Sequence, residues 1–185
     1  MDQAKKSSRI SVRELAIFAM LGTIMFCGDF LMEWAPNVHF VGVLVVIYTV
    51  VYRVRALIPI YLYVLLIGVY QGFGLWWIPY LYVWAVLWGA TMLLPRNMPK
   101  WLSVAAYMVI PALHGLLFGV LYAPFQALAF GLSWQGTLTW IAAGFPFDAI
   151  HGAGNFAAGT LVLPMVELLR RLEKRTDVRA TRSLR

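Results

Sequence analysis

Charged residues are scarce in this chain, and their scarcity excludes an ordinary soluble domain. Asp, Glu, Lys and Arg together make up 12% of the 185 residues, whereas 62% are hydrophobic. The charged share is about half of that in typical soluble domains. A soluble protein of this size could not remove so much apolar surface from water. The composition therefore predicts an integral membrane protein of one domain.

Several chemistries are also missing. The chain has one cysteine, Cys27, so an internal disulfide is excluded, and its apolar surroundings predict a buried thiol. The motifs G-x-x-x-x-G-K-[ST], H-E-x-x-H and G-x-S-x-G do not occur, and no cysteine and histidine set has metal-ligand spacing. We therefore expect no phosphate-loop ATPase, no recognisable catalytic signature, and no metal or cofactor bound by this chain.

The fifteen lysines and arginines lie in four short clusters. The clusters cover residues 5–13, Arg53 with Arg55, Arg96 with Lys100, and residues 170–185. The net charge of +7 is therefore not arranged as on a nucleic-acid-binding surface, where basic residues alternate with residues that contact the bases. We expect no nucleic-acid partner. The clusters instead indicate cytoplasmic segments under the positive-inside rule, with attraction to anionic lipid head groups.

Apolar runs between the clusters predict an all-α protein with six transmembrane helices. The expected spans are 12–32, 38–52, 56–74, 80–94, 101–130, and a last helix from 142 past 169 that follows a loop at 131–139. Pro111 and Pro124 are expected to kink or end the fifth span. An even number of spans places all four basic clusters on one side, so both termini are predicted to be cytoplasmic. The predicted organisation is a cytoplasmic segment 1–11, a transmembrane domain 12–172 and a cytoplasmic basic tail 173–185. An outer aromatic belt is expected from Trp34, Trp76, Trp77, Tyr80, Trp134 and Trp140.

Polar residues within the apolar runs predict a binding pocket. Spacings of three and seven place Asp148, His151 and Asn155 on one face of the last helix. Such a face is costly in lipid, so it must meet protein, water or ligand. His114, Phe118, Tyr122 and Gln126 form a similar stripe on the fifth span. Together the two stripes are predicted to line a pocket that opens outward, with candidate binding residues His114, Tyr122, Gln126, Asp148, His151, Asn155, Trp34, Asn37, Tyr80 and Trp84.

Two alternatives remain open for the polar residues. Gln71 and His39 also lie toward the outer side, and for such single residues a hydrogen bond between helices is the alternative to ligand binding. Asp29 and Glu33 could belong to the pocket or face interfacial water.

Three stretches resemble the substrate-binding S components of energy-coupling factor (ECF) transporters. They are Leu-Met-Glu-Trp-Ala-Pro-Asn-Val-His at 31–39, Gly-Leu-Trp-Trp-Ile-Pro-Tyr-Leu-Tyr-Val-Trp at 74–84, and Phe-Asp-Ala-Ile-His-Gly-Ala-Gly-Asn-Phe at 147–156. The likeness covers about residues 10–172, with a basic N-terminus and small residues on the first helix.

The resemblance implies a multi-pass plasma-membrane subunit of a prokaryotic importer. Such a subunit captures a vitamin or other small micronutrient at the outer face, tips within the membrane and releases the solute inward. A transmembrane T subunit and two ATPases, which use the ATP, drive the movement. The family docks its T subunit through an A-x-x-x-A-type stripe on the first helix. Here Ala16 and Ala19 are three apart and Ala19 and Thr23 are four apart, so these three candidate docking residues match that stripe imperfectly.

The site residues suit a planar, polar, cationic solute. Thiamine, its pyrimidine precursor and a queuosine precursor fit this description, whereas cobalamin fits less well because only histidine could ligate cobalt. The alternative reading of the residues is a small membrane enzyme or a structural membrane subunit that uses the Asp148 and His151 pair.

Overall fold

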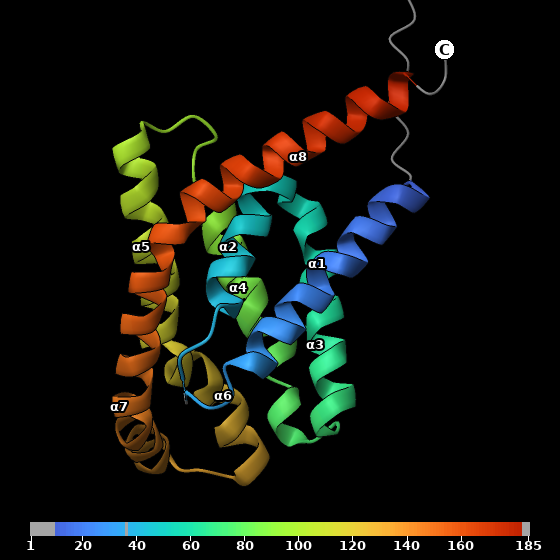
Figure 1. Ribbon diagram of the computed structural model, residues 1–185. Helices are drawn as coiled ribbons and strands as arrows, with labels where there is room; N and C mark the ends of the chain where they lie inside the picture. Colours follow the sequence, from blue (N-terminus) through green and yellow to red (C-terminus); the bar gives the residue numbers. More distant parts are fainter. Residues whose placement is uncertain (1–9, 36, 183–185) are drawn as a thin grey trace, which may run out of the picture.

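The computed structural model describes residues 10–35 and 37–182, and every regular element in these ranges is helical (Figure 1). Pro36, most of the predicted segment 1–11 and the last three residues of the predicted tail lie outside the described residues. The prediction of an all-α membrane protein is confirmed at this coarse level. The α-helices are α1 Val12–Leu31, α2 Val41–Tyr52, α3 Leu57–Gln71, α4 Tyr80–Met92, α5 Lys100–Leu116, α6 Phe118–Phe130, α7 Trp134–Ala158 and α8 Val162–Arg182, and the short 3-10 turns are η1 Arg53–Ala56, η2 Leu75–Trp77 and η3 Gly159–Leu161.

Four helical runs, rather than the six predicted, are long and apolar enough to cross a membrane within the described ranges. They are Val12–Leu31, Val41–Gln71, Lys100–Phe130 and Trp134–Lys174. The 13 residues of α4 are too few to qualify. The second run turns back at η1, where Arg53 has a positive φ of 57°, so α2 and α3 are two helices (Figure 1). The prediction and the structure differ because the prediction used only the apolar composition of each segment. The number of helices that cross a membrane also depends on where the backbone turns.

The fifth predicted span is divided at Leu117 instead of at a proline. Pro111 lies inside α5 and Pro124 inside α6, and neither ends its helix. The division is stabilised from α7, because Asp148 Oδ2 accepts a hydrogen bond from the Gly119 N–H at 3.0 Å. A carboxylate at a helix N-terminus satisfies an otherwise unpaired donor. A contact distant in the sequence therefore stabilises this helix start.

The predicted loop at 131–139 is wrong from Trp134 onward. Gly131, with a φ of 62°, ends α6, and α7 begins at Trp134. Ser133 caps α7 by accepting a hydrogen bond on its side chain from the Gly136 N–H at 3.1 Å. The signal that was missed is this N-cap serine.

The last helix is also not continuous. It changes to a 3-10 turn at η3 before α8 begins, and Pro164 lies in the first turn of α8, where a missing N–H is tolerated. The helix α8 continues through Arg182, so the predicted tail is helical over 173–182.

Close helix contacts depend on glycines. The helix α5 packs against α7, and α1 packs against α3. A Cβ on Gly115 would lie 2.9 Å from the Gly152 backbone nitrogen, and a Cβ on Gly22 would lie 2.8 Å from Leu62 Cδ2. The valine-rich α2 is buried in the centre of the bundle, with Val45 and Val46 fully inaccessible.

The outward face of α1 carries Ala16, Ala19 and Thr23, which are all exposed. Cys27 is exposed as well, so the prediction of a buried thiol is wrong. The reason is that the outer face of a membrane helix meets lipid, and an apolar sequence there does not require burial within the protein.

The two ends of the bundle differ in their connections (Figure 1). The turn η1, the α4–α5 connection and the start of α8 lie at one end, whereas the α3–α4 and α6–α7 connections lie at the other. Trp134, at the α6–α7 connection, and Trp34, in the α1–α2 connection, are 71% and 80% exposed, as an aromatic belt requires. Trp77 differs, because its Nε1 donates to the Val64 carbonyl at 2.7 Å and the ring packs on the core.

Candidate functional site

A pocket of about 240 Å³ lies near the end of the bundle that carries the α3–α4 connection. Helices α1, α3, α4, α6 and α7 and the α1–α2 connection all contribute side chains. Its volume is just under the ~300 Å³ at which typical small-molecule pockets begin. The pocket therefore suits a small solute. The lining residues are Asp29, Met32, Glu33, Ala35, Asn37, Val38, His39, Ile67, Gln71, Tyr80, Phe118 and His151.

The lining of this pocket is acidic. Asp29 and Glu33 both line it, and within the described part of the chain neither a lysine nor an arginine does. Tyr63 Oη donates to Asp29 Oδ2 at 2.9 Å, and Gln71 Nε2 donates to Glu33 Oε1 at 3.5 Å. Uncompensated carboxyl groups in a cleft attract cations. The structure thus places Asp29 and Glu33, whose position the sequence left open, in the wall of the pocket.

Aromatic and imidazole rings continue from the pocket into the bundle. The His39 and His151 ring centroids are 4.6 Å apart, and Phe118 lies 5.2 Å from His151. His114 lies 5.9 Å from Phe118 and 5.5 Å from Trp84, again between centroids. These five rings form one cluster, which we call the histidine cluster.

Buried polar atoms in and beside the histidine cluster lack partners. Each of the following has no hydrogen-bond partner among the described residues: His39 Nδ1, His114 Nδ1, His151 Nε2, Trp84 Nε1 and Asn155 Oδ1. Leaving a buried polar group unpaired costs about 1–3 kcal/mol. Native proteins satisfy nearly all such groups with protein or bound water. These five unpaired atoms therefore indicate a site where water or a polar ligand binds.

Three of these unpaired atoms have a defined hydrogen-bonding role. His114 Nε2 lies 2.9 Å from the Val83 carbonyl, which can only accept, so Nε2 carries the proton and the neutral ring's Nδ1 is an acceptor. Asn155 Nδ2 donates to the Pro111 carbonyl at 3.0 Å, which leaves Oδ1 as an acceptor. Trp84 Nε1 can only donate. The cluster can thus both donate to and accept from a bound molecule.

His39, in the connection before α2, is held neutral. Burial, reinforced by the nearby His114, lowers the pKa of His39 from 6.5 to about 4. A neutral imidazole keeps one donor and one acceptor.

Within the described ranges, no group of three or more His, Cys, Asp or Glu side chains is arranged to hold a metal ion.

The structure brings together only some of the residues predicted from the sequence. Asn37, Tyr80 and His151 line the pocket. Trp84 and His114 belong to the histidine cluster behind it, and Asn155 lies about one helical turn after His151 on α7.

Four other predicted residues lie elsewhere. Asp148 caps α6, Tyr122 Oη donates to the Trp76 carbonyl at 2.6 Å, and Trp34 is exposed. Gln126, also outside the pocket lining, is half-buried on α6. The predicted stripe does continue across Leu117, since the Phe118 ring lies 5.9 Å from His114 and 6.1 Å from Tyr122 between centroids, but Tyr122 and Gln126 do not reach the pocket lining.

Sequence reasoning left several lining residues out of the candidate set. Asp29, Glu33, His39 and Gln71 carried a signal, since each is a polar residue close to the outer end of an apolar run. Phe118 was part of the predicted stripe on the fifth span, and the structure places it in the lining. Ile67 had no signal, because an apolar residue in an apolar helix is not distinctive.

The fold and this pocket define an all-helical membrane protein with a candidate site for a small polar solute. No protein-family model matches the chain, and neither a curated protein nor a solved structure matches it.

Proposed function

We propose that this chain is the substrate-binding subunit of an ECF-type importer, which captures a small micronutrient at the outer face and delivers it inward with a T subunit and two ATPases. One observation carries the proposal. An acidic pocket leads to a cluster of buried rings that includes four unpaired nitrogen atoms. A site with convergent polar groups in an apolar frame is the usual form of a small-molecule site.

The proposed topology has six crossings with both termini in the cytoplasm. In this arrangement α1, α2, α3, α4, the α5–α6 pair and α7 cross the membrane, and α4 is a short crossing. It is supported by the positions of η1, the α4–α5 connection and α8, which carry basic residues and lie at one end of the bundle (Figure 1). The pocket lies toward the opposite, external end.

The proposed substrate is a small, planar, cationic heterocycle. Asp29 and Glu33 favour a positive charge, and the volume of about 240 Å³ favours one or two rings over a large cofactor. Thiamine, its pyrimidine precursor and a queuosine precursor remain candidates, and cobalamin is disfavoured by size. Aromatic rings such as Tyr80 and Phe118 in the wall would pack against a flat ligand.

The proposed docking face for the T subunit is the outward side of α1. Ala16, Ala19 and Thr23 are exposed there, and Thr23 Oγ1 donates to the Ala19 carbonyl at 2.9 Å. Because the Thr23 hydroxyl bonds to a carbonyl of its own helix, it does not need a partner on another helix. The small side chains on this face therefore allow another helix to approach closely.

Ligand-induced stabilisation of the purified chain tests the proposal. The protein is heated in detergent with thiamine, the pyrimidine precursor, a queuosine precursor and, as controls, anionic vitamins such as biotin. A true ligand raises the melting temperature with concentration, by about 2.7 kcal/mol of stability at 100 times its Kd. Co-expression with the T subunit and both ATPases should yield one complex.

Two results would contradict the proposal. One is the absence of stabilisation by every member of a broad vitamin and nucleobase panel, together with a failure to co-purify the ATPases. The other is chemical conversion of a bound compound by the isolated chain, which would favour a membrane enzyme.

A further inference from the structure

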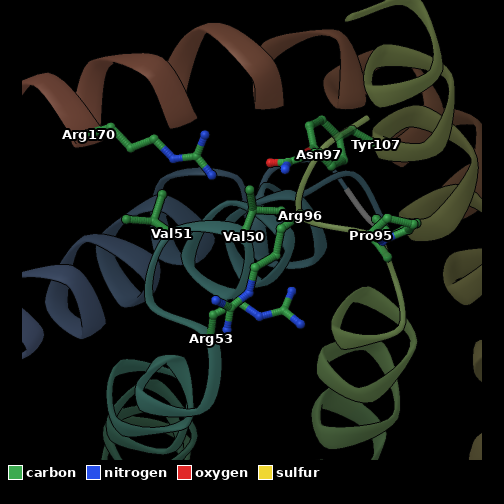
Figure 2. Close-up of a pocket in the computed structure, with 9 residues that line it drawn as sticks. Val50, Val51, Arg53, Pro95, Arg96, Asn97, Tyr107 and Arg170 are labelled. Carbon is green, nitrogen blue, oxygen red and sulfur yellow. The ribbon is translucent and has the colours of Figure 1, made fainter. Parts of the chain in front are cut away.

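A second pocket, of about 330 Å³, lies at the basic end of the bundle (Figure 2). Three arginines enter it from three different elements: Arg53 from η1, Arg96 from the α4–α5 connection and Arg170 from α8. They belong to three of the four basic clusters, which are far apart in the sequence. The remaining lining residues are Val50, Val51, Leu94, Pro95, Asn97 and Tyr107.

The positive charge in this pocket is not balanced by its walls. Among the residues that the structure describes, no aspartate or glutamate lines it. Two carboxylates at this end pair with cations that do not line the pocket, because Glu14 bonds Arg55 and Glu167 lies 4.0 Å from Lys100. Like charges that converge without a counter-charge repel one another, and a bound anion would offset that cost.

Arg53 is held in place by the fold and has an unpaired N–H group. Its backbone has a positive φ of 57°, an uncommon conformation for a residue with a side chain. One terminal nitrogen, Nη2, donates to the Met92 carbonyl at 2.8 Å, which anchors the side chain against the end of α4. Its Nε is buried and has no hydrogen-bond partner among the described residues. A strained backbone and an unpaired guanidinium N–H in one residue are typical of a functional position.

We infer that this pocket binds a phosphate group. Three guanidinium groups present planar arrays of donors that match the tetrahedral oxygens of phosphate, and Arg is the usual residue for this recognition. Asn97 and the Tyr107 hydroxyl add neutral donors to the same wall. The two sources of such a group are the head group of an anionic phospholipid in the cytoplasmic leaflet and free inorganic phosphate.

This inference does not depend on which solute the outer pocket takes. A phosphate held by Arg53, Arg96 and Arg170 would join η1, the α4–α5 connection and α8. Binding to the folded state alone would stabilise the bundle.

Melting temperatures of the full chain in nanodiscs test the inference. One arm uses discs of zwitterionic phosphatidylcholine with increasing inorganic phosphate, at constant ionic strength set with chloride. The other uses discs that contain phosphatidylglycerol and no free phosphate. We expect at least one arm to raise the melting temperature. The phosphate arm alone identifies free phosphate as the source, and the lipid arm alone identifies the head group.

Variants distinguish binding in this pocket from a general attraction of anions to the basic end of the protein. The double variant Arg96→Gln and Arg170→Gln removes two pocket cations that are both exposed, so folding should survive. It should weaken phosphate or phosphatidylglycerol binding by about tenfold or more, since each charge-assisted hydrogen bond is stronger than a neutral one. The matched control is Lys100→Gln with Arg171→Gln, which removes the same charge outside the pocket. Absence of stabilisation in both arms, or an equal loss in the control, would overturn the inference.

Discussion

The imidazole rings of His39 and His151 lie with their centroids 4.6 Å apart at an angle of 61°. This contact joins the α1–α2 connection to α7 at the wall of the outer pocket. Each ring has one buried nitrogen without a partner. A molecule in the pocket that satisfies these nitrogens would therefore contact both the α1–α2 connection and α7.

His151→Ala should weaken binding of the compound found by thermal shift. The variant removes the unpaired Nε2 from the pocket wall. Loss of one buried hydrogen-bond partner costs about 1–3 kcal/mol, which corresponds to roughly a 5- to 150-fold loss of affinity. Calorimetric titration measures the change. Gln126→Ala is the control, because Gln126 is a polar residue of α6 outside the pocket lining. Equal affinities for His151→Ala and the unmodified protein would refute the assignment.

The stability of the protein should fall on acidification. Burial and His114 lower the pKa of His39 from 6.5 to about 4, so between these values the unfolded chain binds a proton that the folded chain does not. The contribution of neutral His39 to the free energy of unfolding is fully present above about pH 6.5 and is lost as the pH falls toward 4. Melting temperatures measured from about pH 7.5 down to about pH 4 should show the decline.

His39→Gln is the control for that decline. Glutamine keeps hydrogen-bonding capacity without titrating, so its melting temperature should depend less steeply on pH over the same interval. If both proteins lose stability in parallel, His39 is not the source.

Asp148→Ala should destabilise the protein by about 1–3 kcal/mol, because the Gly119 N–H that Asp148 caps at 3.0 Å would be left buried without an acceptor. Asp148→Asn keeps an acceptor oxygen and should lose less. Unfolding in detergent followed by circular dichroism measures both. A large loss of ligand affinity in a fully stable Asp148→Asn variant would instead support the ligand-binding role expected from the sequence.

Gly115→Ala should destabilise the bundle by about 1–3 kcal/mol, the usual cost of overpacking a tight contact. The added Cβ would lie 2.9 Å from the Gly152 nitrogen and 3.0 Å from the His151 carbonyl carbon, which belong to the backbone and cannot rotate away. Gly144→Ala in α7 is the matched control, because a Cβ there meets nothing within 4 Å. Thermal unfolding compares them, and similar melting temperatures would show that α5 and α7 are not closely packed.

Ala19→Trp should reduce assembly with the T subunit while leaving the isolated chain folded. Ala19 is exposed on α1, so a bulky ring at this position would extend from the bundle and separate a docked helix. The yield of T subunit and ATPases co-purified with the tagged chain is the measurement. Ala142→Trp, at an exposed position of α7, controls for bulk in the membrane. Normal assembly of Ala19→Trp would exclude this face as the docking site.

The sequence by itself determined the class of the protein and the approximate helices. Apolar runs predicted α1 to α4 to within a few residues of each end. Such features depend on local composition and on the cost of apolar surface in water, both of which are properties of a segment alone. The same local logic located the polar residues at Asp29, Glu33 and His39, although not their common pocket.

The tertiary structure decided where the chain turns and which side chains meet. The start of α6 after Leu117 is stabilised by Asp148 from a different helix, and the Tyr122 hydroxyl donates to the Trp76 carbonyl outside the pocket lining. The convergence of Arg53, Arg96 and Arg170 in one pocket likewise joins residues from three elements. These features rest on contacts between distant segments, and the free energy of such contacts depends on packing geometry that no single segment contains.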